Sequence, residues 1–214
     1  MVGLLNIMLK RFLILAVVVV LVGGGGIYYF GFCKGSKLTA QAPRPLWKLP
    51  YYKFIDQNGK SLSSNDLKGH IYVSDFFFTR CPGVCLVLSN EMQKLQDIYK
   101  GNNDVKLLSF TVDPAEDSVP VLKDYAGRYT THADQWHFLT GNPDSIYKAE
   151  VEGFKLPVLQ NINGAEQYNH SYMLILVDAN GQVRKLYDGT NPTTLSAITN
   201  DISLLEKENL TAEK

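Results

Sequence analysis

This sequence of 214 residues has few cysteines, no excess of either charge and a modest share of charged residues. Each of these features excludes a class of protein. The sequence contains only three cysteines, too few for a small scaffold held together by disulfides. It has no excess of either charge, because 21 lysines and arginines balance 21 aspartates and glutamates, whereas domains that bind nucleic acid are usually strongly basic. Charged residues make up 20% and hydrophobic residues 45%, which excludes a disordered chain. The length predicts one globular domain with a short appendage.

The appendage is an N-terminal hydrophobic segment. After Lys10 and Arg11, the 21 residues 12–32 carry no charge, and as a helix they would span roughly 32 Å, close to the hydrocarbon core of a bilayer. The segment predicts a retained single-pass anchor with the globular domain on the extracytoplasmic (periplasmic or equivalent) side. Basic residues flank both ends, so their count does not decide the orientation. A signal peptide cleaved near residues 23–26 and a lipoprotein attached at Cys33 are the alternatives.

These features divide the chain into four regions. Residues 36–50 contain three prolines and no apolar period, which is typical of an extended tether. We expect the following organisation: a short N-terminal segment at 1–11, a transmembrane anchor at 12–32, a tether at 33–46 and a folded domain at 47–214.

Within the folded domain, apolar and β-branched segments alternate with segments of helical period. The expected strands are 51–55, 60–62, 71–78, 105–112, 136–139, 172–177 and 183–187. The expected helices are 84–100, 119–129, 143–151 and 193–206. Asn58-Gly59 and the residues 178–181 are turn sequences that predict two hairpins. Strands that alternate with helices and end in a hairpin and a helix predict an α/β sandwich around a mixed sheet.

Two of the three cysteines lie where a buried strand runs into a helix. Pro82 suits the first helical position, which would make Cys81 the N-cap and place Cys85 in the first turn. The helix dipole and the neighbouring Arg80 would both lower the pKa of a thiol placed there. Two sulfurs spaced i and i+4 on one helical face can close a disulfide or chelate a metal ion. The alternative is a pair of small apolar core residues.

Three segments around these cysteines resemble the SCO/SenC family. They are residues 77–85 (FFTRCPGVC), 111–117 (TVDPAED) and 169–171 (NHS). The resemblance covers about residues 47–202, in order and at similar spacing. One departure is Leu86, because relatives often carry proline directly after the second cysteine. That difference affects the start of the helix more than the ligand chemistry.

The resemblance implies a membrane-anchored copper metallochaperone rather than an enzyme. It implies a thioredoxin-like three-layer sandwich with an extra β-hairpin, and copper held by Cys81, Cys85 and His170. The same two cysteines would form a redox-active dithiol. Implied partners are the copper-accepting subunit of cytochrome c oxidase or another copper chaperone, and a thiol-redox partner. The residue chemistry agrees, because soft thiolates select Cu(I), and a site with an added imidazole can also hold Cu(II).

Other residues that could ligate a metal are expected to have structural roles. The histidines lie in loops or at strand ends and the methionines lie in apolar periodic segments, and this group comprises His70, His132, His137, Met92 and Met173. Asp113, in an Asp-Pro pair, is expected to start a turn. Its alternative is a supporting or partner-docking role at the site.

Three functions stay open on the residues alone. A copper chaperone needs Cys81, Cys85 and His170 together, whereas a thiol–disulfide oxidoreductase acting on partner-protein cysteines needs only the dithiol. An oxidoreductase of the thioredoxin type normally has a cis-proline before the strand that faces the dithiol. Residues 165–171 contain no proline, which favours metal binding. A thiol peroxidase is the third class, with Thr79 and Arg80 as its only candidate helpers.

Overall fold

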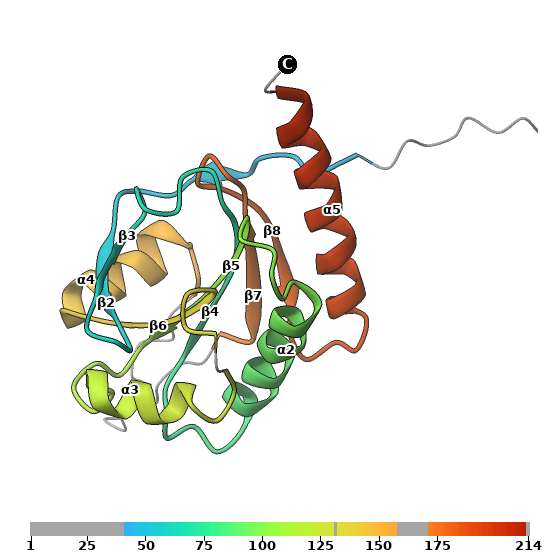
Figure 1. The fold of residues 1–214 in the computed structure, drawn as a ribbon. Helices are drawn as coiled ribbons and strands as arrows, with labels where there is room; N and C mark the ends of the chain where they lie inside the picture. Colours follow the sequence, from blue (N-terminus) through green and yellow to red (C-terminus); the bar gives the residue numbers. More distant parts are fainter. Residues whose placement is uncertain (1–40, 131, 158–170, 213–214) are drawn as a thin grey trace, which may run out of the picture. The chain divides into compact units, whose positions relative to one another are not determined.

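The computed structural model describes residues 41–130, 132–157 and 171–212, and these residues form one eight-stranded sheet with helices on both faces (Figure 1). The strands are β1 (Trp47–Lys48), β2 (Lys53–Asp56), β3 (Ser61–Ser63), β4 (Ile71–Phe77), β5 (Val105–Thr111), β6 (Trp136–Thr140), β7 (Met173–Val177) and β8 (Gln182–Asp188). The helices are α2 (Val84–Ile98), α3 (Val119–Ala126), α4 (Pro143–Lys148), the π-helix η1 (Ala149–Gly153) and α5 (Thr194–Ala212).

The sheet is mixed, as predicted. Its strand order is β1-β8-β7-β4-β5-β6-β2-β3, with β4 parallel to β5 and β5 parallel to β6. The two predicted hairpins, β2–β3 and β7–β8, are both antiparallel. Their turns depend on Gly59 (φ 75°) and Gly181 (φ 74°), which occupy the left-handed region that glycine enters without strain. The β4–β5–β6 group is the parallel part of the sheet, so its carboxyl ends meet at one edge.

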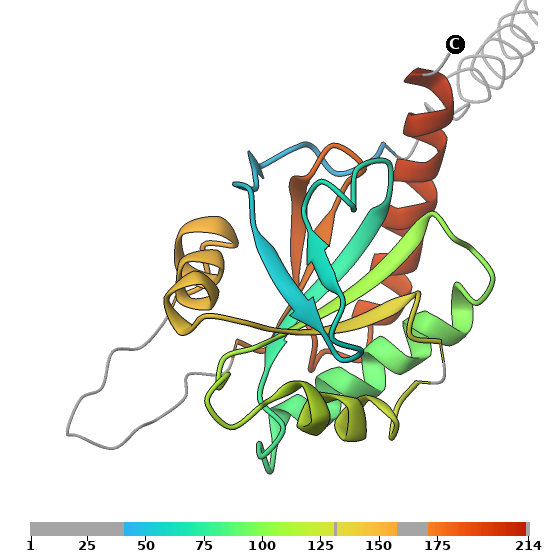
Figure 2. The same ribbon diagram turned by 60° about the vertical axis from the view of Figure 1, so that its left-hand side comes forward.

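Each face of the sheet has its own hydrophobic core. The alternation of side chains along β4 directs Val73 and Phe77 toward α2, α3 and α5, and directs Tyr72 and Phe76 toward α4 and η1. Figure 2 shows α4 on the opposite side of the sheet from α2 and α5. Every residue of β4 is buried, as expected for a central strand covered on both sides. The result is the three-layer sandwich that the family resemblance implied.

The structure corrects the ends of all four predicted helices. Helix α2 ends at Ile98 and not at residue 100, α3 ends at Ala126 and not at residue 129, and α5 continues past residue 206 to Ala212. The helix predicted at residues 143–151 is α4 followed by η1. A π-helical turn is rare and has no distinct apolar period, so the sequence pattern could not separate it from an α-helix.

The predicted membrane anchor, residues 12–32, lies outside the described residues, together with the N-terminal segment 1–11 and Cys33. Among the residues that are described, we find no helix that combines the length and the hydropathy required to cross a bilayer.

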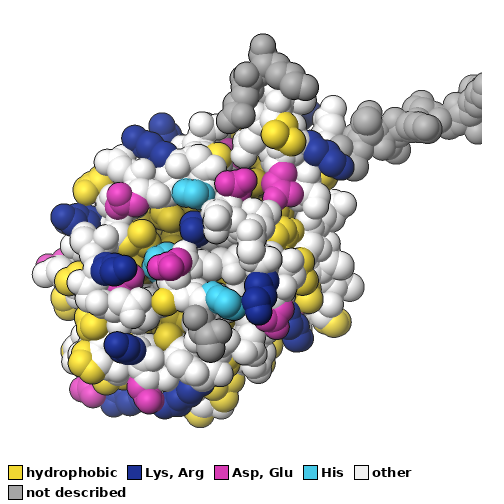
Figure 3. Space-filling model, in the orientation of Figure 1, with side chains coloured by type: hydrophobic (Ala, Val, Ile, Leu, Met, Phe, Trp, Pro, Cys, Tyr) yellow, Lys and Arg dark blue, Asp and Glu magenta, His cyan; other side chains and the backbone are white. Residues whose placement is uncertain are grey.

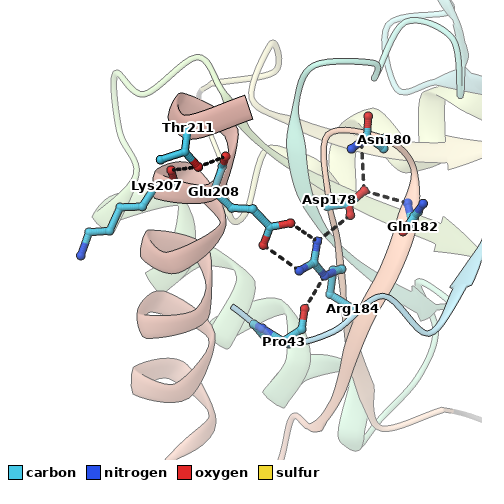
Figure 4. A network of polar contacts seen from close by, with 8 residues as sticks. All are labelled: Pro43, Asp178, Asn180, Gln182, Arg184, Lys207, Glu208 and Thr211. Atoms are coloured by element: carbon cyan, nitrogen blue, oxygen red, sulfur yellow. Dashed lines mark hydrogen bonds and ion pairs between the residues drawn. The ribbon is translucent and has the colours of Figure 1, made fainter. Parts of the chain in front are cut away.

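A buried arginine joins three parts of the chain (Figure 4). The Arg184 guanidinium, on β8, forms ion pairs with Asp178 at 2.9 Å and with Glu208 of α5 at 2.8 Å. Its Nε also donates to the carbonyl of Pro43. Arg184 and Asp178 are both buried, whereas Glu208 is half exposed. This network fixes the segment before β1 and the end of α5 to the β7–β8 hairpin.

On the face shown in Figure 3, basic and acidic side chains are interspersed among apolar and neutral polar ones. Two ion pairs within single helices, Lys94 with Glu91 and Arg128 with Asp124, each have a length of 2.7 Å. Such exposed pairs contribute little to stability.

Candidate metal centre

The structure brings the two central cysteines together just beyond the carboxyl end of β4. Cys81 and Cys85 are 5% and 0% exposed, neither forms a disulfide, and their thiols are in hydrogen-bonding contact. In α/β proteins the carboxyl ends of parallel strands are where ligands bind. The dithiol therefore occupies the position in the fold where a binding site is expected.

The local geometry differs from the prediction that Cys81 caps the helix. Helix α2 begins at Val84 with Gly83 at the N-cap, so Pro82 is not the first helical residue. The Cys81 N–H donates to the carbonyl of Phe78 at 3.2 Å, which closes a turn and keeps this segment out of the helix. The two thiols consequently meet across a turn and not along one helical face.

The predicted lowering of the thiol pKa is wrong for Cys85. Burial raises the pKa of the Cys85 thiol, and the neighbouring Cys81 thiol adds to the effect. Arg80 does not act as a free cation, because its guanidinium pairs with Asp113 at 2.8 Å and with Glu116 at 3.7 Å. Without metal, Cys85 is therefore a neutral thiol, and a bound metal ion must displace its proton to obtain a thiolate ligand.

Two aspartates join the cysteine loop to the loop that follows β5. Asp113, which the sequence suggested as the start of a turn, is buried and accepts a hydrogen bond from Arg80. Ser118 occupies the N-cap of α3, so Asp117, directly before it, does not cap the helix. The Asp117 carboxylate instead accepts hydrogen bonds from Thr79 and Thr111. Sequence reasoning missed this role, because the contact joins residues 38 positions apart.

A further buried carboxyl lies on the helix-covered side of β4. Asp75 is fully buried, and within the described part of the chain neither of its carboxyl oxygens has a hydrogen-bond partner. Burial raises its pKa to about 7, and its charge would raise the pKa of Cys85. In the sequence, Asp75 could have been noticed as an acidic residue within an otherwise apolar strand. Buried groups with shifted pKa values are enriched at functional sites.

The remaining candidate ligands have the structural roles that the sequence predicted. Met92, on α2, is fully buried in the core on one face of the sheet, and Met173 is half buried against the core on the opposite face. The His137 imidazole lies 3.4 Å from Asp56, and burial lowers its pKa. His132 is exposed and His70 is half buried.

The predicted third ligand, His170, lies outside the described residues. Within the described part of the chain, no group of three histidine, cysteine or acidic side chains is arranged to hold a metal ion. The described residues thus supply two soft donors, and the identity of the third ligand stays a prediction.

Comparison with known proteins agrees with the fold. A sequence model described as SCO1/SenC matches residues 43–204. The SCO1 protein homolog of Bacillus subtilis is 35% identical over 153 residues, which cover 71% of this chain and 79% of the relative.

Solved structures show the same similarity. The crystal structure of a SCO1/SenC family lipoprotein from Bacillus anthracis is 35% identical, with a TM-score of 0.69, over 76% of this chain and 98% of that chain. BsSco, described as a Sco family cytochrome c oxidase assembly protein with a disulfide switch, is 33% identical, with a TM-score of 0.67, over 78% and 98% of the two chains.

A more distant protein, yeast Sco1, was solved with copper bound. It is 22% identical, with a TM-score of 0.59, over 74% of this chain and 90% of its own, and it shares the fold. The thioredoxin-like mixed α/β fold predicted from the sequence is confirmed by these similarities. Because the family model spans the whole of the sheet and the dithiol loop, this chain belongs to the SCO1/SenC family.

Proposed function

We propose that this protein binds one copper ion through Cys81, Cys85 and His170 and assists assembly of the copper centre of cytochrome c oxidase. The observation that carries the proposal is the pair of free thiols in contact at the carboxyl end of β4, in a member of the SCO1/SenC family. Two thiolates form a soft donor set that selects Cu(I), and an imidazole would complete a site that also accepts Cu(II).

The surroundings of the thiols suit a metal ion that the protein must bind and later release. Cys81 lies in the turn before α2 and Cys85 lies in its first turn, so both are placed on backbone that the sheet and the helix fix. The raised pKa of Cys85 favours the protonated thiol when the metal leaves. Metal uptake releases thiol protons and metal release takes them back, which makes transfer to a partner reversible.

The membrane location belongs to the same proposal. We infer that residues 12–32 form a single-pass anchor that keeps the domain on the extracytoplasmic side, where it would meet a copper-accepting oxidase subunit or another copper chaperone. The uncharged length of this segment supports the anchor. The Bacillus anthracis relative is described as a lipoprotein, which is a different means of attachment to a membrane.

The central test measures copper affinity. The reduced full-length chain in detergent is titrated against a chromogenic Cu(I) chelator, beside the variants His170→Ala and Met173→Leu. We expect one copper ion per chain, a loss of affinity of at least tenfold in His170→Ala, and nearly unchanged affinity in Met173→Leu, because Met173 packs against the core. Unchanged affinity in His170→Ala would remove that residue from the site.

A thiol–disulfide oxidoreductase is the second candidate function. It is favoured by the two neighbouring free thiols, Cys81 and Cys85, because a dithiol is all that this chemistry requires. The same chain is therefore tested for reduction of a disulfide in a partner protein. A chain that retains no copper but cycles readily between dithiol and disulfide would be assigned to this class.

A further inference from the structure

The Asp117 carboxylate is buried between the two loops at the carboxyl edge of the sheet. Its Oδ1 accepts the Thr79 hydroxyl at 2.5 Å, and its Oδ2 accepts the Thr79 N–H at 3.1 Å and the Thr111 hydroxyl at 2.5 Å. The side chain is 0% exposed. One carboxylate thus binds the end of β5 and the segment that leads into the cysteines.

The donors to this carboxylate are neutral, so the charge of Asp117 is compensated by hydrogen bonds among the described residues. Burying a carboxylate is unfavourable unless its oxygens are well hydrogen bonded. Hydroxyl donors at 2.5 Å to an ionised acceptor are at the strong end of the range for such bonds. Because Thr79 donates through both its backbone and its side chain, Asp117 fixes the backbone and the rotamer of that residue together.

Thr79 is the point from which the cysteine loop is positioned. It lies between Phe78, whose carbonyl accepts from the Cys81 N–H, and Arg80, which pairs with Asp113. The side chain of Arg80 is 58% exposed, so its ion pair is weakened by solvent. The Asp117 contacts are buried and are the stronger link between the two loops.

We propose that Asp117 is a positioning residue that sets the placement of Cys81 relative to Cys85 by holding Thr79. The test by copper affinity rests on the proposed function, whereas a second test, the dithiol–disulfide equilibrium, needs no copper. If the placement of Cys81 changes, the equilibrium between the Cys81–Cys85 dithiol and its disulfide changes as well, because a disulfide tolerates only a narrow range of geometries.

The two threonines provide a matched pair of variants. Thr79→Val and Thr111→Val each remove one hydroxyl donor to the same carboxylate, with the same oxygen–oxygen distance of 2.5 Å. Thr111→Val also removes the acceptor of the Asp113 N–H at 3.0 Å, so it is the more disruptive of the two at the loop after β5. Only Thr79 belongs to the cysteine loop, whereas Thr111 is the last residue of β5. If Asp117 only stabilises the fold, each variant should change the dithiol–disulfide equilibrium in proportion to its own loss of stability, whichever threonine is replaced.

The first measurement is the equilibrium of the full-length chain with glutathione. The Cys81 and Cys85 thiols together give two electrons and two protons to oxidised glutathione, which yields one protein disulfide and two reduced glutathione molecules. We expect Thr79→Val to shift this equilibrium constant about tenfold and Thr111→Val to shift it less than about twofold. Asp117→Ala should behave like Thr79→Val, and Asp117→Asn, which keeps one acceptor oxygen, should restore part of the difference.

A remote control uses the same chemistry elsewhere in the fold. Asp66 accepts the Ser63 N–H at 2.8 Å and the Ser63 hydroxyl at 2.6 Å in the turn after β3, so Asp66→Ala should lower stability without changing the glutathione equilibrium. Equal shifts in Thr79→Val and Thr111→Val, or no shift in either, would overturn the positioning role.

The Cu(I) titration separates this inference from the proposed function. If the unmodified chain binds copper, its affinity should fall about tenfold in Thr79→Val and remain within about twofold in Thr111→Val. If the unmodified chain binds no copper, the proposed function fails. The glutathione equilibrium then still decides whether Asp117 positions the dithiol.

Discussion

The buried position of Asp75 destabilises the ionised form of its carboxyl in the folded protein. Its carboxyl lies on the α2 side of β4, in line with Val73 and Phe77, and Ser109 is its neighbour on β5. The Ser109 hydroxyl accepts a hydrogen bond from Trp136 at 2.9 Å. Burial raises the pKa of Asp75 to about 7, and the nearby Ser109 hydroxyl only partly opposes the shift. The folded chain therefore retains a proton on Asp75 that the unfolded chain loses near pH 4.

This difference makes stability depend on pH. Between about pH 4 and pH 7 the folded state binds one more proton at Asp75 than the unfolded state, so the free energy of unfolding falls as the pH rises through this window and becomes level above it. Asp75→Asn should remove this contribution and be more stable than the unmodified chain at pH 8, by at most about 4 kcal/mol for a shift of about three pH units. Urea unfolding of both proteins at pH 4.5, 6 and 8 measures this difference in the free energy of unfolding.

The comparison between variant and unmodified chain isolates Asp75. Burial also raises the pKa of Glu150 to about 7, and Glu150 would give the same sign of pH dependence in both proteins. Only the difference between the two stability curves is assigned to Asp75. Parallel curves across the whole range would show that Asp75 is ionised in the folded protein.

At the scale of elements, the end of β8 approaches α2 closely because residue 189 is glycine. A Cβ on Gly189 would lie 2.2 Å from Cδ2 of Leu88 and 3.1 Å from the Tyr172 carbonyl oxygen. Leu88 is fully buried and lies one helical turn after Cys85. The close approach thus links the β7–β8 hairpin to the helix that carries the second cysteine.

Gly189→Ala should lower the free energy of unfolding by about 1–3 kcal/mol, because the added methyl group overpacks the core. Leu88→Ala alone should cost about 2–5 kcal/mol through the cavity that it leaves. In the double variant the methyl group has room, so the combined loss should be smaller than the sum of the two single losses. Urea unfolding of the three variants measures the coupling, and strict additivity would mean that Gly189 and Leu88 do not interact.

The elements also show what could be predicted from sequence. The two hairpins, the central strand β4 and the starts of the helices follow from local patterns, because Asn58-Gly59 and the apolar run at β4 are determined by neighbouring residues. The residue that caps α2 could not be predicted in this way. Pro82 suits a helix start by its own propensity, but the Phe78–Cys81 turn, fixed through Thr79 by Asp117, delays the helix to Val84.

The candidate site, too, could be predicted only in part. The dithiol was predicted from the spacing of two cysteines, and the structure places the two thiols in contact. The raised pKa of Cys85 was not predicted, because it arises from burial by α2 and the sheet together. Likewise, the roles of Asp113 and Asp117 depend on contacts between loops that are distant in sequence. Such tertiary contacts leave little trace in one sequence.

At the scale of the whole molecule, the Arg184 network holds the ends of the described fold together. Arg184→Met would leave Asp178 buried without its cation, and removing one partner of a buried pair typically costs about 3–5 kcal/mol. Glu208→Gln should cost no more than about 1 kcal/mol, because Glu208 is half exposed. Urea unfolding measures both variants. Equal losses in the two would show that the buried and exposed pairs contribute alike.

The same network determines how a mechanical load would pass through the protein. A pull on the chain ahead of β1 reaches Arg184 through the Pro43 carbonyl and is shared with α5 and β8. In the sheet order, β8 and β7 stand between β1 and β4. The strand that leads to the cysteines is therefore two strands removed from the point of load, so drag on the tether would strain one edge of the sheet before it disturbed the spacing of the two sulfurs.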